Sequence, residues 1–233
     1  PITSMDFSPD SAFLVTGSED PSVSLWRMSD GLQQKVYYDH RDTVTGVAFH
    51  SSLLEWISIS ADGKVIHWNV AGRDAYIITE PGISVAVSPR DATVVVGYPS
   101  SVVFYDWGEL KAFFSFPVDQ PPQRLEFSHD GVYLASSRFV WHIDEEKQIY
   151  TFDYPQSGVA FSADGRVLAI GETFIDMTNG LSLSTLVLGE DVPTTKGFHS
   201  IALTKDASLF AWGDATQLSL WGLPEDFTPP EPA

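Results

Sequence analysis

One pattern recurs six times along the 233-residue chain and limits its fold more than any other feature. In each copy, a short apolar run meets a turn rich in Ser, Pro, Asp or Gly, and a second apolar run follows. The copies read MDFSPDSAFLVTG, VAFHSSLLEWISI, VAVSPRDATVVVG, LEFSHDGVYLASS, VAFSADGRVLAIG and IALTKDASLFAWG. Their third positions, about 40 residues apart, are Phe7, Phe49, Val87, Phe127, Phe161 and Leu203. Such a period indicates a repeat protein whose neighbouring repeats share a core.

The residues around these copies predict further strands. Polar and apolar residues alternate in SVSLW and KVIHW, whereas TVVVG is apolar and predicts a strand buried on both faces. Asp130-Gly131 and Asp164-Gly165 supply the left-handed backbone that tight hairpins need. A fourth apolar run follows in most copies, as in QQKVYYD and KAFFSF. We therefore expect an all-β chain with four strands in most repeats and no helix.

Four strands repeating about every 40 residues resemble the WD40 β-propeller family, in which each repeat forms one blade around a central channel. The resemblance covers about residues 1–223 and implies about six four-stranded blades, in a ring that a segment outside this chain would complete. The implied repeats span about residues 2–43, 44–82, 83–122, 123–155, 156–197 and 198–223, with a Pro-rich tail or linker at 224–233. No repeat ends in the Trp-Asp dipeptide of the family.

The second repeat carries the resemblance best. In the family, a histidine precedes the first strand, a Ser or Thr lies on the second, an Asp lies in the next turn and a Trp ends the third. The matching residues here are His40, Ser58, Asp62 and Trp68. The resemblance implies a buried structural tetrad in which His40 bridges Asp62 and Ser58, and Ser58 accepts from the Trp68 indole. The alternative is a Ser/His/Asp catalytic set, but the packing that satisfies these groups would also seal them from a substrate.

Other repeats keep only parts of this tetrad. The first repeat has Thr16, Asp20 and Trp26 at the same spacings, and the third has Tyr105 where tryptophan is expected. The fourth and fifth repeats are shorter between their second and third strands and lack the aspartate. A complete tetrad is therefore expected in the second repeat.

Charge and composition limit the classes of partner. The 31 acidic and 13 basic residues give a net charge of −18, which opposes a phosphate backbone, so nucleic acid is not an expected partner. No apolar run approaches the ~20 residues of a membrane helix, so membrane insertion is not expected. The absence of cysteine excludes disulfides and thiolate sites and leaves the redox compartment open. The lack of a signal-peptide pattern slightly favours the cytoplasm.

The sequence contains no linear motif for catalysis or metal binding. The motifs G-x-S-x-G, G-x-G-x-x-G, H-E-x-x-H and the P-loop are absent, and no histidine pair has metal-ligand spacing. We therefore expect no enzyme activity, no cofactor, no metal and no small-molecule ligand. Two alternatives stay open: a periplasmic propeller resembling the TolB type, and a propeller enzyme with its site at the channel mouth.

The function expected from the resemblance is a non-catalytic scaffold for protein–protein interaction within a larger protein or complex. In propellers of this type, partners dock on the face made by the loop that enters each first strand and the turn between the second and third strands. The candidates on that face are Tyr38, Arg41, Tyr98, Arg124, Arg138, Phe139 and Tyr154. Tyrosine, phenylalanine and arginine often form interface hot spots. The expected partner is another protein or a peptide.

The sixth repeat is expected to lack its fourth strand. After QLSLWGL the chain reads PEDFTPPEPA, whose prolines lack the N–H groups that a strand would need. An edge left open in this way would be unpaired and largely apolar. We therefore expect the closing strand to come from outside the 233 residues: upstream sequence, a seventh repeat or a partner chain.

Overall fold

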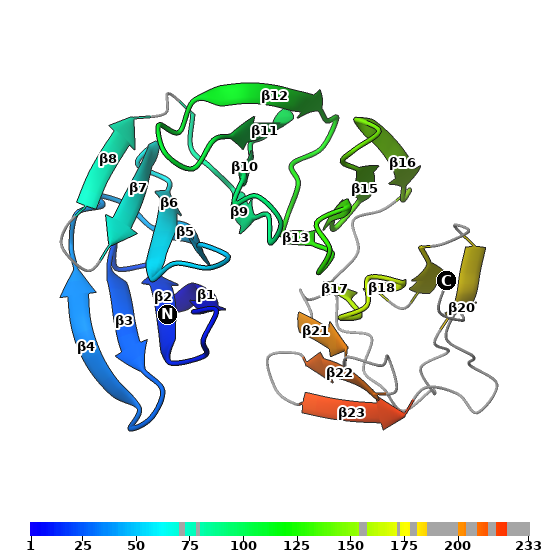
Figure 1. Cartoon of the computed structure of the whole chain (residues 1–233), viewed down its shortest axis with the longest axis horizontal. Coiled ribbons are helices and arrows are strands. Elements are labelled where there is room, and N and C mark those ends of the chain that lie inside the picture. Colours follow the sequence, from blue (N-terminus) through cyan, green and yellow to red (C-terminus); the bar gives the residue numbers. More distant parts are fainter. Residues whose placement is uncertain are drawn as a thin grey trace. The chain divides into compact units, whose positions relative to one another are not determined.

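The structure is a computed structural model that describes residues 1–69, 73–77, 80–153, 158–171, 173–177, 181–185, 200–203, 209–213 and 218–222. Within these residues the regular elements are 23 β-strands in antiparallel sheets, and none is a helix (Figure 1). The expectation of an all-β chain built from blade-like sheets is confirmed. The chain divides into two compact units, Pro1–Leu125 and Glu126–Ala233.

The first unit contains three four-stranded sheets, in each of which the strands follow one another in chain order. The first sheet comprises β1 (Ile2–Phe7), β2 (Phe13–Ser18), β3 (Val23–Arg27) and β4 (Leu32–Tyr37). The second comprises β5 (Val44–Phe49), β6 (Glu55–Ser60), β7 (Lys64–Asn69) and β8 (Arg73–Ile77). The third comprises β9 (Ser84–Val87), β10 (Val94–Gly97), β11 (Ser101–Tyr105) and β12 (Ala112–Pro117).

The other three sheets follow the same order, and the first of them begins at Leu125, the last residue of the first unit. The fourth sheet comprises β13 (Leu125–Phe127), β14 (Tyr133–Ser136), β15 (Phe139–His142) and β16 (Lys147–Thr151). The fifth comprises β17 (Val159–Phe161), β18 (Val167–Ile170), β19 (Thr173–Asp176) and β20 (Leu181–Thr185). The sixth comprises β21 (Ser200–Leu203), β22 (Leu209–Gly213) and β23 (Leu218–Gly222).

The sixth sheet has three strands within the described part of the chain. The expected tail at 224–233 lies outside the described residues. The source of a closing strand, and the limits proposed for the six repeats, therefore stay predictions.

A Ser-x-Asp contact closes the hairpin between the first two strands of several sheets. The Ser8 hydroxyl donates to Asp10 Oδ1 at 2.6 Å and accepts from the amide of Phe13 at 2.9 Å. The same 2.6 Å contact joins Ser128 to Asp130 and Ser162 to Asp164. Gly131 and Gly165 follow these aspartates with φ of 70° and 72°, the left-handed values expected from the Asp-Gly pairs. The recurring turn sequence therefore folds the same way because its own side chains satisfy the turn amides.

The first two sheets pack face to face through a dense apolar core. Val15, Val23 and Leu25 of the first sheet meet apolar side chains of the second, namely Val44, Val47, Phe49, Trp56, Ile66 and Trp68. The approach is close at Gly17, where an added Cβ would lie 2.5 Å from Val44 Cγ1. A larger residue at this position would push the sheets apart.

Polar side chains on the first strand of one sheet hydrogen-bond to backbone amides on the first strand of the next sheet. Asp6 Oδ2 accepts from the amide of Phe49 at 2.7 Å, and Ser4 Oγ accepts from the amide of Val47 at 3.1 Å. In the second unit, Glu126 Oε1 accepts from the amide of Phe161 at 3.2 Å. Within the described part of the chain, β5 and β17 are edge strands of their sheets. These side chains therefore accept from backbone amides on an edge where no described strand pairs with them.

Candidate protein-interaction site

The four expected tetrad residues meet in the second sheet. His40 lies just before β5, Ser58 on β6, Asp62 in the β6–β7 turn and Trp68 on β7. The distances are 2.7 Å from His40 Nε2 to Ser58 Oγ, 2.8 Å from Trp68 Nε1 to Ser58 Oγ and 3.3 Å from His40 Nδ1 to Asp62 Oδ1. The His40 side chain is fully buried, and Ser58 has no exposed surface.

The hydrogen-bond partners determine the protonation of His40. Burial lowers the pKa of His40 because it disfavours the imidazolium, and the nearby Asp62 carboxylate opposes this effect only in part. The neutral ring then donates from Nδ1 to Asp62 and accepts the Ser58 proton at Nε2. The Ser58 oxygen in turn accepts from the Trp68 indole. Every polar atom of the set is thus occupied, and the Ser58 hydroxyl is not exposed to a substrate.

The first and third sheets show two variations on this arrangement. In the first, the Trp26 indole donates to Thr16 Oγ1 at 3.0 Å, while Asp20 accepts from Ser22 in its own turn. In the third, the hydroxyls of Tyr98 and Tyr105 are 2.8 Å apart. A pair of tyrosines thus forms a buried polar link where the second sheet uses serine and tryptophan.

The structure divides the expected docking residues into exposed and buried ones. In the first unit, Tyr38 is 72% exposed and Arg41 and Arg124 are also exposed, but Tyr98 is only 2% exposed. In the second unit, Phe139 is 2% exposed and Arg138 is half-buried beside it, with its guanidinium 5.6 Å from the Phe139 ring. Tyr98 and Phe139 are buried, so neither presents the exposed aromatic ring that was expected of a docking residue. Tyr154 lies outside the described residues.

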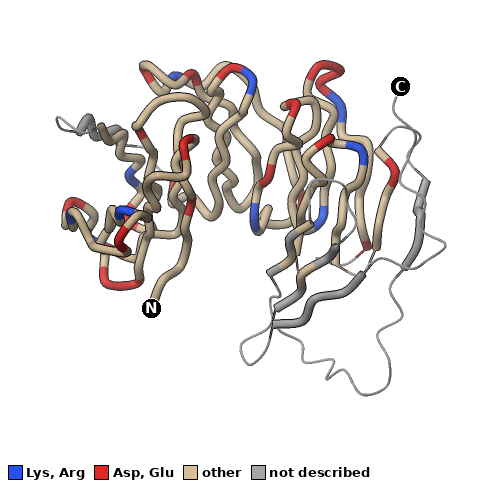
Figure 2. Tube along the Cα trace, turned by 60° about the horizontal axis from the view of Figure 1, so that its bottom comes forward, with Lys and Arg blue, Asp and Glu red and all other residues tan. Residues whose placement is uncertain are grey.

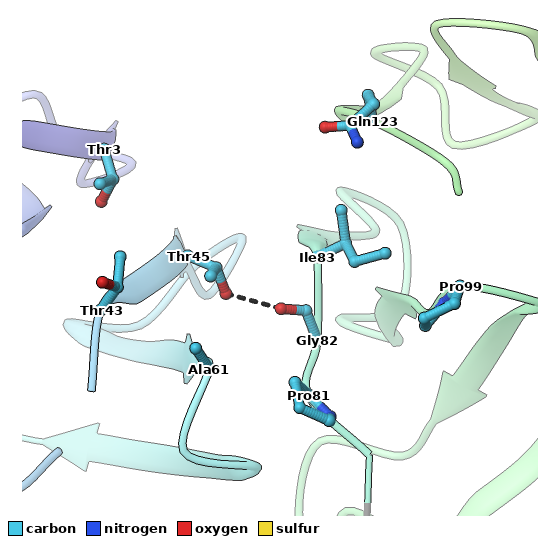
Figure 3. A pocket seen from close by; sticks show the side chains of 9 residues that line it. All are labelled: Thr3, Thr43, Thr45, Ala61, Pro81, Gly82, Ile83, Pro99 and Gln123. Carbon is cyan, nitrogen blue, oxygen red and sulfur yellow. Dashed lines mark hydrogen bonds between the residues drawn. The ribbon is translucent and has the colours of Figure 1, made fainter. Parts of the chain in front are cut away.

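A cavity of about 450 Å³ opens among the loops of the first unit (Figure 3). Its lining comprises Thr3, Thr43, Thr45, Ala61, Pro81, Gly82, Ile83, Pro99 and Gln123. These residues come from β1, β5, the segments that enter β5, β9 and β13, and the β6–β7 and β10–β11 turns. Most of these loops are of the types expected to form the docking face. None of the lining residues is among the tyrosine, phenylalanine and arginine candidates for that face.

The lining of this cavity carries no charge. The Thr45 hydroxyl is used internally, since it donates to the Gly82 carbonyl at 2.7 Å, and the Thr3 hydroxyl donates to the Val44 carbonyl. The other polar side chains of the lining are the Thr43 hydroxyl and the Gln123 amide, which lie beside the apolar surfaces of Ile83 and two prolines. Elsewhere in the unit acidic residues recur at the turns (Figure 2). The cavity thus suits an uncharged group with a few hydrogen-bonding atoms.

A second polar cluster, which the sequence did not reveal, joins the second and third sheets. Glu55 Oε2 contacts His67 Nε2 at 3.0 Å and accepts from the Trp107 indole at 3.1 Å. The His50 ring lies edge-on to Trp107 with centroids 4.5 Å apart. Hydrogen bonding to Trp107 and His67 lowers the pKa of Glu55, although burial opposes the shift. No spacing signal relates Glu55 to a tryptophan in the next repeat.

The described residues contain no group of three His, Cys, Asp or Glu side chains that could hold a metal ion. In the same part of the chain, no helix has the length and apolar character to cross a membrane.

Comparison with known proteins agrees with the sheet architecture. The family described as "WD domain, G-beta repeat" matches residues 1–27 and 31–69, which cover the first sheet and the first three strands of the second. Residues 1–69 are WD40 repeats. The resemblance that the sequence suggested is thereby confirmed, and the His40 set lies inside the matched WD40 region.

Several relatives match a larger part of the chain. Periodic tryptophan protein 2 of Arabidopsis thaliana is 26% identical over 82% of this chain and 24% of its own length. The Dictyostelium discoideum homolog of that protein is 26% identical over 89% of this chain and 25% of its own length. Pre-mRNA-processing factor 19 of Oryza sativa subsp. japonica is 23% identical over 73% of this chain and 36% of its own length. The chain thus spans about a quarter to a third of these relatives.

Proposed function

We propose that this chain is a non-catalytic WD40-type scaffold that binds another protein or a peptide through the loops of its first unit. The observation that carries the proposal is the uncharged cavity built by loops of all three sheets of that unit. A rigid set of sheets that presents converging loops is suited to recognition, because the loops vary while the sheets hold them in place.

In this proposal, His40, Ser58, Asp62 and Trp68 have a structural role and not a catalytic one. A catalytic serine must reach its substrate, but Ser58 has no exposed surface and its oxygen already contacts both His40 and Trp68. The set instead ties the loop before β5 to β6 and β7. Because that loop leads into Thr43 at the cavity, we propose that the tetrad holds one wall of the binding site.

The chemistry of the cavity defines the part of a partner that would enter it. An uncharged lining favours a neutral aliphatic or amide side chain, since a charged group would lose its hydration without gaining an opposite charge. The exposed Tyr38 and Arg41 lie on the segment that leads to Thr43 and would contact the partner around this anchor.

The test uses two substitutions that place a cation at the cavity, Thr43→Arg and Gln123→Arg, with Gln34→Arg on the exposed face of β4 as the matched control. A partner that co-purifies stoichiometrically with the wild-type protein from its native source should bind each cavity variant at least tenfold more weakly, about 1.4 kcal/mol. Gln34→Arg should bind as wild type does. Equal binding by all four proteins, with melting temperatures unchanged, would contradict a docking role for the cavity.

A further inference from the structure

A histidine closes the hairpin turn between β5 and β6. The amides of Ser52 and Leu53 both donate to His50 Nδ1, at 3.0 and 3.1 Å. Because a backbone N–H can only donate, Nδ1 must be the unprotonated nitrogen of a neutral ring, and the ring proton lies on Nε2. The turn in this form therefore requires the neutral state of His50.

The corresponding turns of other sheets are closed by serine. In each turn the first residue donates its amide to the carbonyl of the residue five positions on, and this holds for His50 as for Ser8, Ser128 and Ser162. The three serine hydroxyls also accept from the amide of that later residue, at 2.9 to 3.0 Å. A serine hydroxyl does not titrate near neutral pH, whereas an imidazole does. The second sheet thus has a titrating group at a position where the other turns have none.

The surroundings of His50 combine an aromatic ring with two titratable groups. From the β11–β12 turn, the uncharged indole of Trp107 lies edge-on to the His50 ring, with centroids 4.5 Å apart. This indole donates to Glu55 Oε2 at 3.1 Å, and the same oxygen lies 3.0 Å from His67 Nε2. The charges that act on His50 are those of Glu55 on β6 and His67 on β7. All of these residues belong to the first unit.

Protonation of His50 is less favourable in the folded chain than in the unfolded one. Partial burial lowers the pKa of His50 because it disfavours the imidazolium, and the Glu55 carboxylate opposes this shift while His67 adds to it. An unfolded histidine titrates at about pH 6.5. The contribution of His50 to stability is therefore complete above about pH 6.5, and it is lost as the pH falls from there through the lower pKa of the folded state.

We propose that His50 makes the β5–β6 turn a proton-sensitive element of this chain. When Nδ1 takes up a proton it becomes a donor, so it can no longer accept from the amides of Ser52 and Leu53. Both amides then lose their acceptor, and the turn opens locally while the strands that it joins stay paired. Leu53, which is 47% exposed, moves with the turn.

The proposed response is independent of the cavity. The β5–β6 turn lies at the opposite end of β5 from the loop that carries Thr43 to the cavity. The β1–β2 turn provides a matched reference without an imidazole, because Ser8 closes it and the amide of Ala12 donates to Asp10 Oδ1 at 3.0 Å. Asp10 stays ionised between about pH 5 and pH 7.5, since the Ser8 hydroxyl lowers the pKa of that carboxyl.

Amide hydrogen exchange, measured by NMR, reports on the two hydrogen bonds directly. In the wild-type chain the protection factors of the Ser52 and Leu53 amides, which correct for the intrinsic effect of pH on exchange, should fall at least about fivefold between about pH 7.5 and pH 5. The protection of the Ala12 amide should not change. Unchanged protection at Ser52 and Leu53 would overturn the proposal, and so would an equal loss at all three amides, which would indicate a general destabilisation.

His50→Asn is the matched variant, because the Oδ1 of asparagine can occupy the place of Nδ1 as an acceptor that does not titrate. Its Ser52 and Leu53 amides should have the same protection factors at both pH values. The proposal fails if this variant shows the same loss of protection in acid as the wild type.

Two further variants remove the other groups that titrate near this turn. His67→Gln keeps an N–H donor for Glu55 without an imidazole. Asp6→Asn removes a carboxyl whose pKa is raised by burial to about 6 and which accepts from the amide of Phe49, next to His50. The pH dependence at the turn should persist in both variants, and its loss in either one would assign the response to that group instead of His50.

A readout without any substitution is the titration of the His50 ring itself. Its carbon-bound protons, followed by NMR over the same pH range, should titrate with a midpoint below about 6.5. The loss of protection at Ser52 and Leu53 should have the same midpoint. Two different midpoints would show that another group opens the turn and would overturn the proposal.

Discussion

At the scale of single residues, His40 shows how burial and hydrogen bonding together decide what a polar side chain can do. Its ring contacts Ser58 at 2.7 Å and Asp62 at 3.3 Å, and it has no exposed surface. Asp62 in turn accepts from the amides of Arg41 and Lys64. A histidine with these contacts is part of the core, so its substitution should lower the stability of the fold.

Substituting His40→Ala should lower the free energy of unfolding by about 1–3 kcal/mol, since the buried Ser58 hydroxyl and the Asp62 carboxylate lose their shared partner. Urea denaturation of the wild type and the variant would measure the difference. His129→Ala, at an exposed position of a hairpin turn, is the control and should remain within about 0.5 kcal/mol of the wild type. An unchanged midpoint for His40→Ala would contradict the structural role proposed for the tetrad.

At the scale of strands and sheets, Asp6 links β1 to β5, but its burial disfavours the charged carboxylate. Burial raises the pKa of Asp6 to about 6, although the amides of Phe49 and Phe7 oppose the shift by hydrogen bonding to the carboxylate. The folded protein therefore binds a proton that the unfolded chain releases between about pH 4 and pH 6. The contribution of Asp6 to stability should fall as the pH rises through this window and stay low above it.

Asp6→Asn should remove this pH dependence. Between pH 4 and pH 7, the free energy of unfolding of the variant should rise by about 1–2 kcal/mol relative to that of the wild type. This value is reduced because the carboxylate is partly exposed. Denaturant titrations at intervals of one pH unit would measure it. Asp10→Asn is the control, because the Ser8 hydroxyl lowers the pKa of the exposed Asp10 and the slope should have the opposite sign. A difference between Asp6→Asn and wild type that does not vary with pH would contradict this account.

At the scale of the whole molecule, charge is the dominant feature. A net charge of −18 on 233 residues produces repulsion that opposes the compact state, and described ion pairs such as Arg27–Asp30 are exposed and contribute little. The sheets must therefore be held mainly by apolar contacts such as those between Val15, Val47 and Trp56.

Salt should stabilise this protein. Raising sodium chloride from about 20 to 300 mM shortens the screening length severalfold and should raise the melting temperature by about 2–5 °C. Scanning calorimetry would measure the shift, with an equally concentrated neutral osmolyte as the control. A fall in melting temperature with salt would show that attractive surface pairs outweigh the net repulsion.

The sequence by itself determined the features that depend on local chemistry. The period of the apolar runs predicts the strands, and the Ser-x-Asp and Asp-Gly turns predict the hairpins, because each depends on residues close together in the chain. The resemblance to the WD40 family likewise implied that His40, Ser58, Asp62 and Trp68 form one set within a repeat, and the structure joins them there.

Only the tertiary structure decided which side chains face solvent and which groups from different repeats meet. Tyr98 and Phe139 have the residue types of a docking face but are buried, whereas Thr43 and Gln123 have no such signal and line the cavity. The contact between Glu55 and Trp107 joins two repeats that no motif connects. The physical reason is that burial and contact are set by neighbouring sheets across space, and a pattern within one strand carries no information about which sheet lies opposite.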